Sequence, residues 1–349
     1  MKIIGSFIVS ILLSFGAYSY YVSQPLFDTH LEDQPVFKIA ERSQALTFAR
    51  SNEALILVLK HHGDRVSGIN LTQLYGSEKT ANLIDLYHSV GYQALSEIEG
   101  PSSPAPLSSL IQPYHYTGPH LAAGTNYREH AEEVYLDDPP FLFPKLAKTT
   151  AWNADISFTQ RLDYEAELCM VPLDDISNVS SVSEAHEFGL ILCNDFSDRY
   201  TLFKQLKLSE PMGTTGFADA KGKSSFFPTG YLFVIPKEDD FYLDIALKLH
   251  VNNLTRQDFS SSTMILKVDD IVNQAFSLKE TPFYTSETSV SLLPHGKVKQ
   301  GSIILTGTSA GVIFKPINIW NQGFYLSLGD EVITSADFLG HLDNRIVSK

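Results

Sequence analysis

Two glutamates, Glu165 and Glu167, stand two residues apart in an apolar, strand-forming stretch at residues 162–171. Because strand side chains alternate between faces, both carboxylates are expected to point to the same side. Burying two negative charges without a partner is prohibitively costly, and converging oxygen ligands suit a divalent cation such as Mg²⁺ or Ca²⁺. The alternative is a solvated strand face, since exposed glutamates are common. The remaining motifs favour the cation site.

A histidine and a glutamate form the second candidate group. His130 and Glu133 lie three residues apart after a short predicted strand, on what reads as a helical turn, so their side chains are expected to face each other. A carboxylate beside an imidazole raises its basicity and fixes its tautomer, which prepares the histidine to take a proton from water. The same spacing also occurs in surface pairs, so this motif alone decides nothing.

The composition excludes some classes of partner. The chain has 349 residues, 44% of them hydrophobic, and a formal net charge of -14. It is long enough for one large or two ordinary folded domains. A nucleic-acid surface or a surface for anionic membranes would need clustered lysine and arginine, which an acidic chain does not favour. A cation or a small enzyme substrate fits better.

The first 24 residues are interpreted as a signal peptide or a membrane anchor. An apolar run extends from Ile3 to Val22 behind Lys2. Ala17 and Ser19 would suit signal cleavage, whereas the run's length and its terminal tyrosines favour an uncleaved anchor, the reading we prefer. Either would place the catalytic part outside the cytosol, in the periplasm of a bacterium. A buried N-terminal helix is the alternative.

The two cysteines flank the candidate ligands. Cys169 follows Glu167 by two residues, and Cys193 precedes Asp195 by two. Each cysteine would therefore share a strand face with a possible ligand. We expect buried free thiols, with a disulfide as the alternative.

Residues 25–115 are expected to form a small mixed domain and a linker. Strands are predicted at 36–40 and 54–60 and a helix at 77–90, and His61 with His62 reads as part of a turn. From residue 116 to 349 the pattern is that of a β-rich catalytic domain. Its predicted strands are 121–123, 162–171, 190–194, 231–235, 245–251, 303–305 and 331–334, and its predicted helix is 269–276, capped by Asp269.

Ordered motifs from residue 121 to the end resemble those of the fumarylacetoacetate hydrolase family. One chance match is easy, but a series in the right order is specific. The matching segments are 124–130 (GTNYREH), 141–145 (FLFPK), 162–168 (LDYEAEL), 194–199 (NDFSDR), 221–222 (KG) with Pro228, 251–253 (VNN), 256–257 (RQ), 262–264 (STM), 304–312 (ILTGTSAGV), 328–332 (LGDEV) and 340–347 (GHLDNRIV).

The resemblance implies an α+β, β-rich fold: a mixed β-sandwich roll, here with a small N-terminal domain and an apolar N-terminal helix. It also implies a divalent cation, Mg²⁺ or alternatively Ca²⁺ or Mn²⁺, held by Glu165, Glu167 and Asp195. Family members are commonly homodimers. A zinc site is disfavoured because the cluster is rich in carboxylates.

The resemblance further assigns roles around that cation. His130 and Glu133 would activate water, Lys221 would offset charge on an enolate, and the substrate would contact Arg199, Tyr127 and Thr308. The implied reaction is hydrolysis of a carbon–carbon bond in a small acylpyruvate-like 2-oxo acid. Alternatives on the same site are a sugar-acid dehydratase, an oxo-acid decarboxylase or an isomerase, and outside enzymes a binding protein that keeps the fold. Leu146 and Leu202 depart from the family pattern, which leaves the substrate open.

Overall fold

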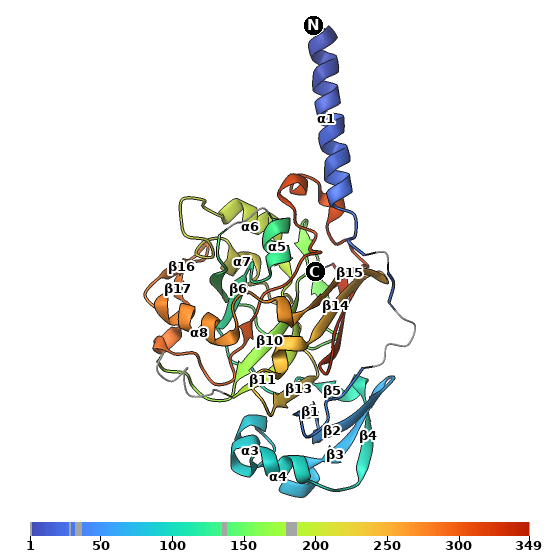
Figure 1. Ribbon diagram of the computed structural model, residues 1–349, viewed down its shortest axis with the longest axis vertical. Helices are drawn as coiled ribbons and strands as arrows, with labels where there is room; N and C mark the ends of the chain where they lie inside the picture. The colour runs from blue at the N-terminus through green and yellow to red at the C-terminus, as the bar shows by residue number, and fades with distance from the viewer. Residues whose placement is uncertain (1, 28, 32–36, 135–137, 179–186, 349) are drawn as a thin grey trace.

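The computed structural model describes residues 2–27, 29–31, 37–134, 138–178 and 187–348. Helix α1 (Lys2–Val22) projects from a body built of two main sheets, and a small group of strands and helices lies at the end opposite α1 (Figure 1). The other helices are α2 (Leu71–Tyr75), α3 (Leu83–Val90), α4 (Tyr92–Glu97), α5 (Arg128–Glu133), α6 (Arg199–Gln205), α7 (Phe217–Ala220) and α8 (Val268–Ser277).

The larger sheet has eleven strands among the described residues and joins both parts of the chain. β1 pairs antiparallel with β13, and β5 pairs with β1. Its strand order is β4 (Ser102–Pro106), β3 (Arg65–Asn70), β2 (Leu55–His62), β1 (Ala45–Ser51), β13 (Leu232–Pro236), β11 (Phe188–Asn194), β10 (Ala166–Pro172), β18 (Ile304–Leu305), β6 (His120–Gly124) and β7 (Phe141–Lys145), with β5 (Leu110–Ile111) off this path.

The smaller sheet packs against one face of the larger one. Its order is β15 (Leu254–Ser260), β14 (Ala246–Val251), β19 (Glu331–Ala336), β20 (Gly340–Val347) and β8 (Ile156–Ser157). Two short ladders complete the described strands: β9 (Leu162–Asp163) with β12 (Ser197–Asp198), and β16 (Pro282–Tyr284) with β17 (Ser289–Ser291). The result is a mixed α+β, sheet-rich fold.

Both faces of β10 and β11 are buried, which explains their almost continuous apolar sequence. Leu168 and Leu190 belong to the core that contains Leu247 and Leu342 of the smaller sheet. Their neighbours along the strands join a second core against α3. A strand covered on both sides holds its polar residues in fixed positions, and this is where the candidate ligands lie.

Several sequence-based predictions of elements need correction. The predicted strand at 162–171 is interrupted at Tyr164 and Glu165, between β9 and β10. The predicted helix at 77–90 begins at residue 83, where the Asn82 side chain caps it. Residues 37–40 form no strand, and residue 36 lies outside the described residues. His61 and His62 end β2 instead of forming a turn, and α8 begins at Val268, behind Lys267 instead of Asp269.

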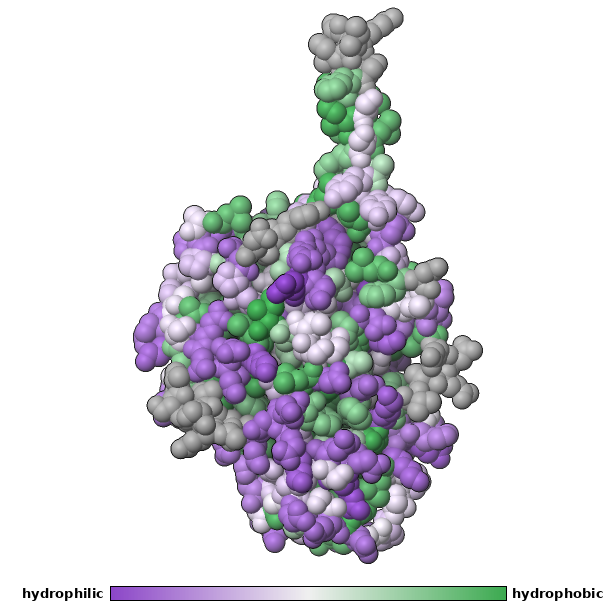
Figure 2. All heavy atoms as spheres, in the orientation of Figure 1, coloured by the Kyte–Doolittle hydropathy of each residue, from purple (hydrophilic) through white to green (hydrophobic). Residues whose placement is uncertain are grey.

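The predicted membrane anchor is also wrong. In Figure 2 the coloured part of α1 shows apolar side chains beside residues of intermediate hydropathy, and no helix formed by the described residues is long and apolar enough to cross a membrane. The location outside the cytosol that we inferred from that anchor is withdrawn with it. The division of the chain near residue 115 stays a prediction.

Candidate active site

Three carboxylates converge where β10 begins and β11 ends. One oxygen atom each of Glu165, Glu167 and Asp195 lies within 4.8 Å of the others, and all three residues are buried. The main chain sets this arrangement, because the Asp195 N–H donates to the Glu165 carbonyl at 2.9 Å. The Glu165 N–H in turn donates to the Asn194 side chain at 3.1 Å. The predicted ligands are therefore brought together, although Glu165 lies at a break between strands.

Buried cations surround two of these carboxylates. The Nζ atom of Lys221 lies 2.7 Å from Glu165 Oε2 and 2.8 Å from Asp195 Oδ2. Arg199 Nη2 contacts the other oxygen of Glu165, and Lys145 Nζ lies 2.5 Å from Asp195 Oδ1. These ion pairs compensate the charges of Glu165 and Asp195, which would otherwise be too costly to bury.

Glu167 differs from the other two carboxylates. Among the described residues it has no ion-pair partner, and its Oε2 accepts a hydrogen bond from the Gly307 N–H at 2.7 Å. Burial, followed by the charges of Asp195 and Glu165, raises its pKa well above the usual range. Burial also tends to raise the pKa of Glu165, but the nearby cations outweigh it and lower that pKa to about 2. The cluster thus holds an uncompensated acidic group.

This cluster fits a divalent cation. Its three carboxylates are hard oxygen ligands, and each carboxylate offers about four lone-pair positions, so the contacts with lysine and arginine leave some for a metal. Glu167 favours a bound cation because it has no ion-pair partner among the described residues, and a metal ion beside it would offset its negative charge. Glu165, Glu167 and Asp195 would hold the ion.

The predicted histidine and glutamate also meet, on α5. His130 Nδ1 lies 3.3 Å from Glu133 Oε2. Glu133 is fixed by Lys315 and by the Gly311 N–H, which lies 3.0 Å from Oε1. Burial lowers the pKa of His130 to about 4, so its imidazole is neutral at neutral pH. A neutral ring that donates from Nδ1 to the carboxylate has its Nε2 lone pair free to accept a proton.

A cavity of about 300 Å³ brings the two groups to one place. His130, Glu165, Arg199, Lys221 and Thr308 line it. Behind this lining, Glu133 contacts His130, Asp195 contacts Lys221, and Glu167 has an oxygen atom within 4.8 Å of one of Glu165. The cavity therefore offers one opening to a histidine base, a carboxylate cluster and two cations.

Tyr127 is not placed at the cavity. It is fully buried at the residue before α5, and its ring packs edge-on against Phe259 with 5.1 Å between the ring centroids. Tyr127 is absent from the residues that line the cavity. Its predicted contact with the substrate has no support in this geometry.

Sequence reasoning missed three residues of the site. Lys145 is completely buried and donates to Asp195 and, at 2.9 Å, to the Phe226 carbonyl. Asp163 accepts from Arg199 Nε at 2.8 Å and so orients that side chain. Gln257 donates to Thr308 Oγ1 at 2.8 Å. Lys145 and Gln257 belong to motifs given in the sequence analysis. A lysine at the end of an apolar strand could have indicated a buried ion pair, because lysine is almost never fully buried unless it is paired.

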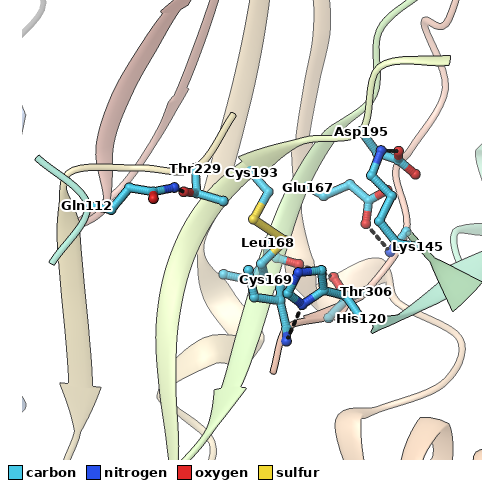
Figure 3. Close-up of a disulfide and its surroundings, with 12 residues drawn as sticks. Gln112, His120, Lys145, Glu167, Leu168, Cys169, Cys193, Asp195, Thr229 and Thr306 are labelled. Carbon is cyan, nitrogen blue, oxygen red and sulfur yellow. Dashed lines mark hydrogen bonds and ion pairs between the residues drawn. A yellow bond between two sulfur atoms is a disulfide. The ribbon is translucent and has the colours of Figure 1, made fainter. Parts of the chain in front are cut away.

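The two cysteines form a disulfide between β10 and β11, so the expectation of free thiols is wrong. Figure 3 shows this bond with the side chains of Glu167 and Asp195 to one side and Lys145 reaching toward Asp195. Cys193 of β11 lies opposite Glu167 of β10 in the antiparallel register. Cys169 is two residues after Glu167 on the same face of β10, and so it is a diagonal neighbour of Cys193. The bond crosslinks the two strands that carry the cluster.

Comparisons with known proteins find a relative in sequence and several structures with the same fold. A curated relative, an uncharacterised protein of Staphylococcus saprophyticus, is 28% identical over 247 residues, covering 69% of this chain and 72% of its own length. Three solved structures share the fold. They are fumarylacetoacetate hydrolase from Exiguobacterium antarcticum (TM-score 0.58, 22% identity, 88% of this chain and 99% of that one), 5-carboxymethyl-2-hydroxymuconate delta-isomerase from Mycobacterium smegmatis (0.54, 20%, 88% and 100%) and maleylpyruvate hydrolase from Sphingobium sp. SYK-6 with manganese(II) and pyruvate (0.54, 18%, 87% and 99%).

The match to a family model covers most of the chain. The model for the C-terminal region of fumarylacetoacetate (FAA) hydrolase matches residues 120–347, which include every residue of the carboxylate cluster and both residues of the histidine pair. Hydrolases and isomerases both occur among the proteins that share this fold, so the shared fold does not choose between those reactions. The chain belongs to the fumarylacetoacetate hydrolase family.

Proposed function

We propose that the protein is a divalent-metal-dependent hydrolase that cleaves a carbon–carbon bond in an acylpyruvate-like 2-oxo acid. The observation that carries this proposal is the opening of one cavity onto both the carboxylate cluster and His130. A neighbour with the same fold binds manganese(II) and pyruvate, which supports a metal and an oxo-acid ligand. A bound metal ion would polarise the oxygen atoms of the oxo acid as a Lewis acid.

His130 would act as the general base. It would take a proton at Nε2 from a water molecule that attacks the acyl carbonyl carbon, while Glu133 holds its Nδ1 side. The bond between that carbon and the neighbouring methylene would then break, leaving a carboxylic acid and the enolate of pyruvate. Lys221 and Arg199 would offset the enolate charge, and the proton on His130 would return to the methylene carbon.

An isomerase is the second candidate. It would use the same enolate but would move a proton between carbon atoms without the attack of water. Several structural neighbours are named as isomerases, which favours keeping this alternative. The pairing of a neutral histidine with a carboxylate inside the cavity favours water activation and so the hydrolase.

The test is turnover of acylpyruvates, oxaloacetate and sugar acids by the full chain with Mg²⁺, with Mn²⁺ and with EDTA. We expect metal-dependent cleavage of an acylpyruvate. Glu167→Gln should lose metal affinity and activity together. Glu133→Gln should keep metal affinity and lose on the order of 10²-fold in kcat, as expected for an impaired base. Glu132→Gln, an exposed neighbour on the same helix, is the matched control and should behave as wild type.

Two results would contradict the proposal. Metal-independent turnover would exclude the assigned role of the carboxylate cluster. Isomerisation of an unsaturated oxo acid with no cleavage of any acylpyruvate would replace the hydrolase with the second candidate.

A further inference from the structure

The outer wall of the cavity is made of apolar side chains. They come from β7, from α6 and α7, and from the segments after α6 and before η7 (Gln322–Phe324). The residues that the argument uses are Phe141, Leu202, Leu206, Met212, Phe217 and Ile319. Phe217 packs edge-on against Phe141, with 4.9 Å between the ring centroids, which makes this wall continuous. The polar side chains of the described lining are all buried, and we call their place the inner end of the cavity, where Arg199 and Lys221 contact Glu165 of the carboxylate cluster.

The positive charges of the lining are also confined to the inner end. Among the described lining residues, the lysine and arginine side chains are Lys221 and Arg199, and both already contact Glu165. On the outer side of α6, Lys204 lies 5.0 Å from the ring of Tyr200 and does not line the cavity. A carboxylate bound at the apolar wall would therefore lose its water without gaining a cation.

The mouth of the cavity continues this apolar character. Phe203 and Leu208 line it and are 62% and 87% exposed. Exposed large apolar side chains at the edge of a binding cavity provide a surface for part of a ligand. An extended ligand anchored at Lys221 would meet apolar groups along its whole remaining length.

We propose that the distal part of the substrate is uncharged and apolar: an alkyl or aryl group attached to the 2-oxo acid, and not a second carboxylate. This inference rests on the proposed function, because the inner end must hold the oxo acid. The cavity volume of about 300 Å³ is the volume that roughly ten water molecules occupy in the liquid. That suits a small oxo acid with a short chain or a single ring.

The test is binding of a series of 2-oxo acids to the full chain with Mg²⁺, measured by isothermal titration calorimetry. 2-Oxobutanoate, 2-oxohexanoate and 2-oxooctanoate vary the chain length. We expect Kd to fall about fourfold per methylene until the cavity is filled, the value for transfer of one CH₂ from water to an apolar site. 2-Oxohexanedioate matches 2-oxohexanoate except for its terminal carboxylate, and we expect it to bind at least about tenfold more weakly.

Phe203→Arg places a cation at the mouth of the cavity. In this variant we expect the Kd of 2-oxohexanedioate to be equal to or lower than that of 2-oxohexanoate. The residue is exposed, so the arginine needs no burial. Leu74→Arg, at an exposed leucine on α2 outside the cavity, is the control and should leave both affinities unchanged. A Kd independent of chain length, or a dicarboxylate bound by wild type as tightly as the monoacid, would overturn the inference, as would no binding of any acid in the series.

These results separate the inference from the proposed function. Cleavage of acylpyruvates combined with a preference for dicarboxylates would overturn only the inference. The expected binding series combined with no cleavage of any acylpyruvate would support the inference and overturn the hydrolase.

Discussion

Replacing the two glutamates of the cluster one at a time should give opposite effects on the stability of the metal-free protein. Glu165 contacts two buried cations, Lys221 and Arg199, whereas Glu167 has no ion-pair partner among the described residues. Breaking a buried ion pair by removing one partner costs about 3–5 kcal/mol. Glu165→Gln should therefore lower the free energy of unfolding by that amount.

Glu167→Gln should change the free energy of unfolding by no more than about 1 kcal/mol, and in the stabilising direction. The substitution removes a buried acid that the surrounding carboxylates disfavour, and the glutamine oxygen still accepts the Gly307 N–H. Each variant thus serves as the other's control, because both remove one carboxylate and keep the side-chain shape.

The assay is unfolding in urea, first with EDTA and then with Mg²⁺. Wild type should gain about 2.7 kcal/mol when the free metal concentration is 100 times Kd, and both variants should lose that gain because each removes a ligand. Equal losses of stability with EDTA would refute the account of charge compensation. A full gain from Mg²⁺ in Glu167→Gln would refute the metal site.

Three further predictions concern other parts of the site and the fold. Lys145→Met should lower stability by about 3 kcal/mol or more by leaving Asp195 with one cation fewer, measured by urea unfolding. Gly311→Ala should reduce both stability and kcat, since φ is +104° and a Cβ would stand 2.0 Å from a main-chain oxygen; wild-type activity would contradict this. Burial lowers the pKa of His61, which contacts Tyr231 Oη at 2.7 Å, to about 4, so stability present above pH 6.5 should be lost as the pH falls toward 4. His61→Gln cannot titrate and should show a smaller loss in circular dichroism melts, and an identical acid profile would contradict this.

The metal ligands were predictable because their spacing carries the information. Two glutamates with one residue between them indicate that both side chains lie on one face of a strand. Asp195 was predicted from the motif that begins at the end of β11. Glu165 meets the expectation in spite of the strand break at Tyr164, because the Asp195 N–H fixes its main chain. The local sequence pattern and the hydrogen bond from Asp195 therefore place Glu165 in the same position.

Lys145, which compensates part of the charge of Asp195, was not predictable from spacing. Lys145 and its partner Asp195 are 50 residues apart, and the sequence around the lysine is an ordinary apolar strand. The same reason explains the missed β1, whose mixed sequence becomes a strand through pairing with β13. It also explains the disulfide, because the register of β10 against β11 brings Cys169 and Cys193 together. Pairing across the sheet decides these features, and a single sequence does not record it.

The pairing of β1 with β13 makes the N-terminal strands part of the same sheet as the strands that carry the site, so the two parts of the chain are expected to fold together. β13 is apolar throughout, and between Ala45 and Ala49 its main chain is covered by β1. On its other side β13 pairs with β11, which leads to Asp195. A fragment that began at residue 116 would present β13 as a bare apolar edge, which is a template for aggregation. We therefore expect that a chain without the N-terminal strands would need another cover for that edge.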